Sequence, residues 1–78
     1  MSKLTFKYFK KLHEKFISDS NYREGYEYAQ KLSYDNLTLG ELRALVSNYI
    51  DVAMRYDNVN GYGHAQAIRE ILQSKVSA

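Results

Sequence analysis

The two histidines are the side chains in this sequence that could transfer protons or bind a metal near neutral pH. His13 and Glu14 would begin the zinc-binding pattern H-E-x-x-H, but Ile17 stands where the second histidine is required. His64 would need an orienting partner to act as a general base, and the other histidine is far away in the sequence. We therefore predict neither a metal site nor a catalytic imidazole, and we place His64 at the edge of a helical apolar stripe.

The segment Gly61-Tyr62-Gly63 stands at the start of a predicted helix, where free backbone amides would attract an anion. No strand is predicted before it, and Gln66 occupies the position of the third glycine in a dinucleotide-binding motif. The nine carboxylates are scattered along the chain, without the close pair that acid–base catalysis requires. We therefore expect a protein without enzymatic activity and without a cofactor.

Tyrosine is the unusual component of the composition, with eight residues in a chain of 78. Its side chain combines a rigid contact area with a polar tip, which is why tyrosine is enriched at binding hot spots. Tyr34, Met54 and Tyr62 are the hardest to assign to a core, and together with His64 they form the predicted partner-binding set. The first functional hypothesis is a small protein-interaction module, such as an inhibitor, an adaptor or an assembly or regulatory factor.

Positive charge is concentrated at the amino terminus. Five lysines and one glutamate give residues 1–16 a charge of +4, so the other 62 residues must sum to −2 for the net charge of +2. Lys3, Lys7, Lys11 and Lys15 line one side of a predicted helix and could follow phosphates, which makes nucleic-acid binding the alternative hypothesis. This helix has no arginine for base recognition, and its aromatic face could instead lie on anionic lipid.

Length and composition limit the class of protein. A chain of 78 residues is expected to be one domain, and the absence of cysteine excludes disulfides and thiolate zinc sites. Lysines interrupt the first 16 residues, and no stretch approaches the ~20 apolar residues of a membrane span. We expect a cytoplasmic protein, and the abundance of lysine, tyrosine and asparagine would suit an AT-rich bacterial or phage genome. Self-association stays open.

Apolar residues recur with a helical period in four segments, and the chain contains no proline. The predicted helices cover about residues 3–18, 21–33, 39–56 and 61–75. Short connections between helices favour antiparallel neighbours. The sequence thus predicts an all-α, compact four-helix domain over residues 1–78, built as a bundle or as two packed helical hairpins. The helix at 39–56 is expected at the centre because its apolar arc is broad.

The clearest local signal is the start of the third helix. Thr38 can cap the amide of Glu41 while the Glu41 carboxylate reaches back to the Thr38 amide, and Leu37 can pack on Leu42. Asn60 is a candidate cap for the fourth helix.

Two short segments, GYEYAQ at 25–30 and GYGHAQ at 61–66, share four of six residues. With a composition this biased, chance nearly accounts for such a match, and we infer no function from it. Gly25 and Gly61 are instead expected where the missing Cβ permits close approach of another backbone.

Overall fold

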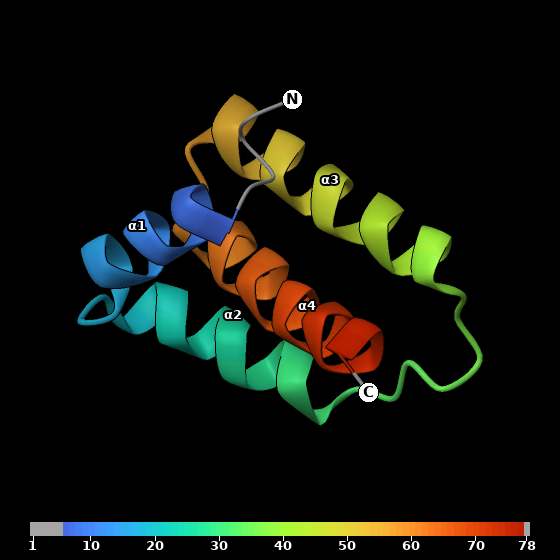
Figure 1. Ribbon diagram of the computed structural model, residues 1–78. Helices are drawn as coiled ribbons and strands as arrows, with labels where there is room; N and C mark the ends of the chain where they lie inside the picture. The colour runs from blue at the N-terminus through green and yellow to red at the C-terminus, as the bar shows by residue number, and fades with distance from the viewer. Residues whose placement is uncertain (1–5, 78) are drawn as a thin grey trace.

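Four α-helices and no strand make up residues 6–77, the part of the chain that the computed structural model describes (Figure 1). The helices are α1 (Phe6–Phe16), α2 (Ser20–Lys31), α3 (Leu39–Tyr56) and α4 (Val59–Ser77). The prediction of an all-α four-helix domain is confirmed. The α3 bounds match the prediction, whereas the other described ends differ by at most two residues; positions 3–5 of the first predicted helix lie outside the described range.

The helix starts follow from local side-chain chemistry. The Thr38 amide donates to Glu41 Oε1 at 2.8 Å and the Glu41 amide donates to Thr38 Oγ1 at 3.1 Å, so the predicted capping box is confirmed. Asp19 caps α2 by accepting from the amides of Asn21 and Tyr22 at 2.8 and 3.3 Å. These caps satisfy amides that have no partner within their own helix.

The prediction that Asn60 caps the fourth helix is wrong. α4 begins at Val59, so Asn60 already lies inside it, and its side-chain amide donates to the Asn21 carbonyl of α2 at 3.1 Å. Asn60 therefore joins two helices. α3 ends at Tyr56, and its C-cap Asp57 has a left-handed backbone (φ 52°), a conformation that aspartate tolerates better than most residues.

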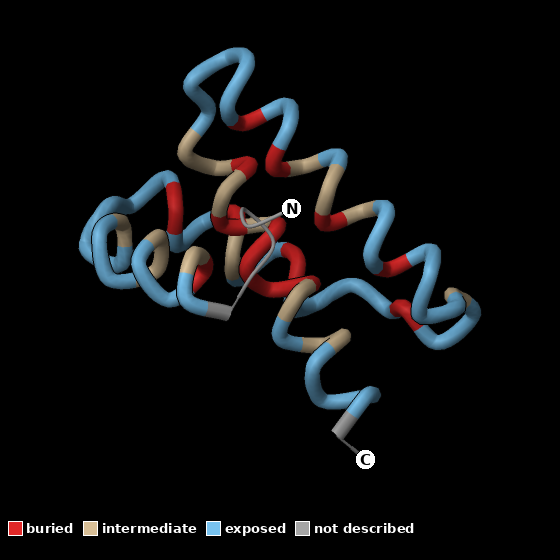
Figure 2. Tube along the Cα trace, turned by 45° about the horizontal axis from the view of Figure 1, so that its top comes forward, coloured by how far each residue is buried: buried red, intermediate tan, exposed pale blue. Residues whose placement is uncertain are grey.

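The central helix is α4 rather than α3, which corrects the prediction. α4 runs between α2 and α3 and also contacts α1, so every other helix packs on it (Figure 1). The first half of α4 is buried almost continuously, whereas α3 keeps an exposed outer side (Figure 2). The reason is the small residues of α4: Gly61, Gly63, Ala65 and Ala67 add little to an apolar stripe but let neighbouring helices approach from several sides.

The glycines show how closely α2 and α4 pack. A Cβ at Gly25 would lie 2.9 Å from Asn60 Cγ and closer still to the Asn60 carbonyl oxygen, which confirms the predicted close approach there. A Cβ at Gly61 would lie 3.2 Å from the Cβ of Ala53 on α3, a tight but less demanding contact. Gly63, for which the sequence predicted no close approach, makes the closest contact of the three, against the backbone of α2.

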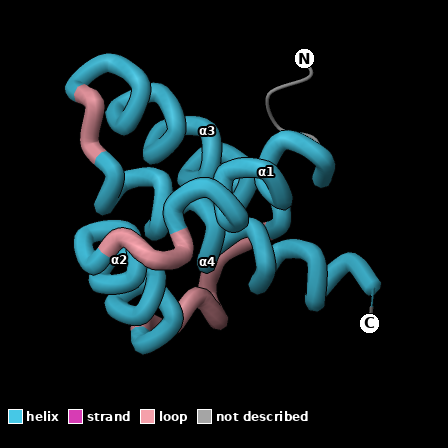
Figure 3. The backbone as a smooth tube through the Cα atoms, turned by 90° about the vertical axis from the view of Figure 1, so that its left-hand side faces the viewer, coloured by secondary structure: helices cyan, strands magenta, loops and turns pink. Residues whose placement is uncertain are grey.

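The core joins side chains from all four helices and the loop between α2 and α3. The connections, pink in Figure 3, are residues 17–19, 32–38 and 57–58. The buried cluster is Phe9, Ala29, Tyr34, Leu42, Val46, Ile50, Ala65, Ala67 and Ile68. Leu37, the predicted staple residue, is partly buried against this cluster. None of the four described helices combines the length and the apolarity that crossing a lipid bilayer requires.

Candidate functional site

Tyr34 belongs to the core, so the reason for predicting it as a contact residue is wrong. It is 8% exposed, and its hydroxyl donates to the Ala29 carbonyl at 2.9 Å. That carbonyl lies in the last turn of α2, where helical acceptors lose their own partners. Burial raises the Tyr34 pKa, and the neighbouring Tyr49 and Tyr28 raise it further. Tyr34 closes the end of α2 and has little surface to offer a partner.

Tyr62 has a structural contact that the sequence did not reveal. Its ring stacks on Phe16 of α1, with centroids 5.6 Å apart and planes 13° apart. Burial is the main cause that raises the Tyr62 pKa, and the negative charges of Tyr8 and Asp57 in their ionised forms raise it further. Half-buried, Tyr62 therefore helps to hold α1 on α4. Met54, by contrast, is 51% exposed on α3 and is not brought next to Tyr62 by any described contact.

His64 lies between two tyrosines from different helices. Its ring stacks on Tyr49 of α3 at 4.7 Å between centroids and contacts Tyr28 of α2 at 5.4 Å. Burial lowers the His64 pKa, and within the described structure its buried Nδ1 has no hydrogen-bond partner. The imidazole is therefore neutral near pH 7, and it contributes an aromatic contact between α2 and α3 rather than a charge.

We use the name aromatic surface for Tyr28 of α2, His64 of α4 and Tyr49 of α3, whose rings are in contact, together with Val52 and Tyr56, which continue the Tyr49 face of α3. On α3 the three residues follow the i, i+3, i+7 spacing of a single helix face. Tyr28 is 57% exposed, Tyr56 is 69% exposed and Val52 is also exposed. Large apolar side chains thus remain open to solvent around the partly buried pair of Tyr49 and His64.

Because the helix at 39–56 was expected at the centre, the residues of its broad apolar arc, including those of the aromatic surface, were expected to be covered. Tyr49, Val52 and Tyr56 share the broad apolar arc that Leu42 and Val46 also occupy. Only the centre of that arc is buried, because α4 covers α3 from one side. The breadth of the arc was the available signal, since a helix that packs on one neighbour needs a narrower stripe.

The aromatic surface lies on the side of α4 away from α1. Tyr62 and Arg69 of α4 contact the α1 rings of Phe16 and Phe9. Gln66 lies on the same stripe of α4 as Tyr62 and Arg69, which is the stripe that faces α1. At 100° per residue, His64 lies roughly 200° around the helix from Gln66, so it faces away from α1. The aromatic surface is therefore separate from the α1 contact.

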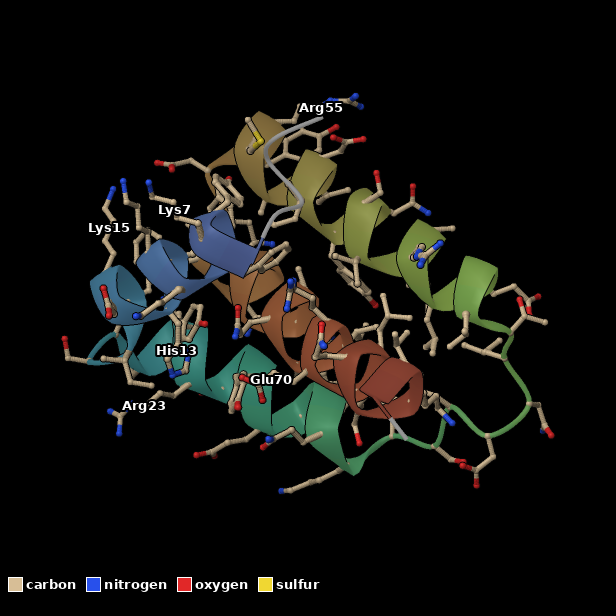
Figure 4. All side chains as sticks on the ribbon, viewed as in Figure 1. Lys7, His13, Lys15, Arg23, Arg55 and Glu70 are labelled. Atoms are coloured by element: carbon tan, nitrogen blue, oxygen red, sulfur yellow. The ribbon has the colours of Figure 1, made fainter. Side chains whose placement is uncertain are left out.

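A polar network joins α1, α2 and α4 on the other side. Tyr26 donates to Glu70 Oε1 at 2.5 Å, and Gln66 Nε2 donates to Glu70 Oε2 at 2.9 Å. His13 Nδ1 and the Tyr22 hydroxyl are 2.9 Å apart. Figure 4 shows His13 between α1 and α2, with Glu70 projecting over α2. Sequence reasoning missed this network because Tyr26 and Glu70 are 44 residues apart.

The electrostatics of the network favour a structural role. Burial raises the pKa of Tyr26 to about 12, and the hydrogen bond to Glu70 and the charge of that carboxylate add to the effect. Burial also raises the pKa of Tyr22. Both phenols are therefore protonated at neutral pH, and both oxygens of Glu70 already accept hydrogen bonds. A groove of about 390 Å³ beside Gln66 and Glu70 separates this part of α4 from α1.

The lysines of α1 lie where the periodicity placed them. Lys7, Lys11 and Lys15 are exposed, while Lys3 lies outside the described residues. Lys7 and Lys15 point away from the rest of the molecule (Figure 4). Lys15 Nζ lies over the ring of the neighbouring Phe16, 5.2 Å from its centroid, within the range of a cation–π contact. The row is accessible to an anionic partner.

Over residues 6–77, the acidic and histidine side chains form no group of three or more that could hold a metal ion. Comparison of the chain with protein-family models, with curated proteins and with solved structures gives no match, so its function has to be argued from its own residues.

Proposed function

We propose that this protein is a small interaction module that binds another protein through the aromatic surface. The observation that carries the proposal is the packing of His64 between Tyr28 and Tyr49, with Tyr56 and Val52 exposed beside it. A small domain gains stability by burying large apolar groups, so leaving several of them open on one side costs it part of its core. Their burial by a partner would recover that free energy.

The arrangement is suited to protein recognition. Tyr28 and Tyr56 have few rotatable bonds, and Tyr28 already packs on the His64 ring, which is stacked on Tyr49. Such preorganised aromatic side chains lose little conformational entropy on binding. The surface spans from α2 to α3 across α4, which favours a partner that presents an apolar helix face to it.

The first experiment is affinity capture from the source cell with the wild-type chain and with surface variants. Tyr28→Ala and Tyr56→Ala should each reduce the recovery of the protein partner, because truncating a hot-spot aromatic costs about 2 kcal/mol or more of binding free energy. Met54→Ala is the matched control, since Met54 is about as exposed as Tyr28 and lies roughly 200° around α3 from Tyr56. Equal loss from all three variants would argue against this surface.

Tyr34, Tyr62 and Met54 have different places in the proposal than the sequence suggested. Tyr34 supports the aromatic surface from beneath, because it neighbours Tyr28 and Tyr49. Tyr62 holds α1 on α4, so Tyr62→Ala is expected to destabilise the fold rather than to remove a contact with the partner. Of the four residues predicted from sequence, His64 alone is a member of the aromatic surface.

Nucleic-acid binding through α1 is the second candidate. The observation that favours it is the exposed row of Lys7, Lys11 and Lys15, one helical turn apart. Lysines at this spacing can neutralise successive phosphates, although the absence of arginine on α1 disfavours base recognition. Nuclease treatment during the capture distinguishes the candidates: a protein partner that survives nuclease supports the aromatic surface, and recovered nucleic acid supports the lysine row.

A further inference from the structure

The two ring nitrogens of His64 have different surroundings. Nδ1 is enclosed and has no hydrogen-bond partner within the described structure, whereas Nε2 is the ring nitrogen that solvent reaches. The ring packs between Tyr49, at 4.7 Å between centroids, and Tyr28, at 5.4 Å, and these contacts hold it in this orientation. The aromatic surface therefore has a nitrogen between two of its tyrosine rings that a partner can contact.

The surroundings indicate which nitrogen carries the proton. A neutral imidazole has one N–H donor and one nitrogen lone pair. A buried N–H group without an acceptor is costly and rare in folded proteins. We therefore assign the lone pair to the enclosed Nδ1 of His64 and the proton to Nε2. With this assignment His64 offers a hydrogen-bond donor to whatever covers the aromatic surface.

A partner that covers the aromatic surface would also cover this donor. The Nε2 hydrogen would lose its contact with water, and leaving it without an acceptor would cost binding free energy. A partner face that is apolar throughout could not compensate for that loss. The partner therefore needs one hydrogen-bond acceptor among its apolar side chains, at the place that lies against His64.

A neutral oxygen suits this place better than a carboxylate. The groups that face His64 are the phenol rings of Tyr28 on α2 and Tyr49 on α3, and neither carries a positive charge at neutral pH. Burial alone accounts for the lowered pKa of His64, so no described carboxylate stabilises its charged form. A carboxylate brought here would lose its hydration without gaining a counter-charge, which is costly.

We propose that the partner of the aromatic surface presents an apolar helix face with one neutral oxygen acceptor, such as a side-chain amide or hydroxyl, and that this oxygen accepts the Nε2 hydrogen of uncharged His64. The inference rests on the proposed function and specifies the chemistry of the partner. It excludes partners whose face is wholly apolar or carries a carboxylate at this position.

Such binding depends on pH in a defined direction. Protonation of His64 would place a second N–H at the enclosed Nδ1, where the partner cannot reach it. Covering the ring removes further water, so the pKa of His64 is lower in the complex than in the free protein. Affinity is therefore constant above the pKa of the free protein and falls as the pH drops through it. A carboxylate acceptor would raise the pKa on binding and reverse this dependence.

The first experiment tests the position of the proton in the free protein. A long-range ¹H–¹⁵N NMR spectrum at about pH 7.5 distinguishes the two neutral forms of histidine by the signals of their ring nitrogens. We expect His64 to carry its proton on Nε2. His64→Phe identifies the signal, because His13 is the other histidine of the chain. A proton on Nδ1 would overturn the proposal whatever the partner is.

The second experiment measures binding. The probe is the protein that the immobilised wild-type chain retains from a cell extract and the Tyr28→Ala chain does not, purified for surface plasmon resonance. The wild type should bind it more weakly at about pH 5.5 than at about pH 7.5. His64→Phe keeps an aromatic ring but loses the donor, so it should bind about tenfold more weakly than the wild type at the higher pH. It should also lack the pH dependence that His64 adds. Circular dichroism at both pH values checks that both chains are folded.

The failures of the two proposals are distinguishable. Equal retention of every protein by Tyr28→Ala and the wild type would refute the proposed function, and this inference with it. If Tyr28→Ala loses the probe but His64→Phe binds it as the wild type does at both pH values, the aromatic surface stands and the hydrogen bond from His64 is wrong. Tighter binding by the wild type at the lower pH, absent from His64→Phe, would indicate a carboxylate and overturn the neutral acceptor.

Discussion

Gly63 of α4 lies directly against the Tyr22 carbonyl of α2, with no room for a side chain between the two helices. A Cβ at Gly63 would also lie 2.8 Å from the Tyr26 amide nitrogen, so the obstruction is backbone that cannot rotate away. Gly25, on the facing side of α2, has the same relation to the Asn60 carbonyl. The contact between α2 and α4 therefore depends on two glycines, one on each helix.

Gly63→Ala should strongly destabilise the protein. The added methyl would force α2 and α4 apart, and overpacking of this kind costs about 1–3 kcal/mol or more. Gly40→Ala is the matched control, because the nearest atom to its added Cβ is Thr38 Oγ1 at 3.8 Å. Alanine favours a helix over glycine, so this control should be neutral or stabilising by up to about 1 kcal/mol. Urea unfolding of both variants measures the difference, and equal midpoints would contradict the close contact.

Thr38→Ala should destabilise the protein by about 1 kcal/mol, because it removes the acceptor for the Glu41 amide. In a domain of this size that loss lowers the melting temperature by roughly 4–8 °C. Thr38→Ser retains the hydroxyl and should stay close to the wild type. Thermal unfolding monitored by circular dichroism tests both variants, and a melting temperature unaffected by Thr38→Ala would argue against the capping box.

His64 should make stability depend on pH. Its pKa in the folded protein lies below the ordinary value of 6.5 because of burial, so the unfolded chain takes up the proton at higher pH than the folded protein. The contribution of neutral His64 to the free energy of unfolding is fully present above pH ~6.5, and it is lost as the pH falls toward the pKa of His64 in the folded protein. Urea unfolding at about pH 7.5 and about pH 5.5 should show this loss in the wild type and a smaller loss in His64→Phe. Parallel behaviour of the two proteins would exclude His64 as the cause.

Glu70 should control the titration of Tyr26. Removing the carboxylate charge by Glu70→Gln should lower the Tyr26 pKa from about 12, although burial, the largest cause of the shift, will keep it above its ordinary value. Phenolate absorbance during an alkaline titration measures the change, with Tyr26→Phe identifying the signal. Glu24→Gln, an exposed site on α2, is the control and should leave the curve unchanged.

The same hydrogen bond should contribute to stability. Tyr26→Phe should cost about 1 kcal/mol because Glu70 loses one donor. Tyr56→Phe removes the hydroxyl of an exposed tyrosine, so its effect should stay within about 0.5 kcal/mol.

Changing Lys7 and Lys11 together to glutamine distinguishes the two functional candidates. Both side chains are exposed, so the fold should be unaffected. If the lysine row binds phosphates, nucleic-acid affinity should fall, and the slope of log K against log salt should shrink by roughly one per contact. If the aromatic surface binds a protein, the change should affect mainly the association rate, with the lifetime of the complex nearly constant. Surface plasmon resonance over a range of salt concentrations separates these outcomes.

The features that the sequence determined are local in the chain. The Thr38–Glu41 capping box involves residues three apart, so the start of α3 could be predicted without knowledge of any other helix. The exposed lysines of α1 likewise follow from the period of a single helix. The number of helices and their approximate ends could also be predicted, because each depends on residues only a few positions apart.

The tertiary structure decided which apolar faces are covered. Tyr49 and Tyr56 belong to one apolar arc of α3, yet only the part that α4 reaches is buried, so the sequence could not show which part of the broad arc stays exposed. Tyr34 was predicted to be a surface residue, but the path of the 32–38 loop buries it and places its hydroxyl against the Ala29 carbonyl. The bond between Tyr26 and Glu70 joins residues 44 apart. Burial and such distant contacts depend on how the helices pack together, and hydrophobic periodicity records only the face that each helix would prefer to bury.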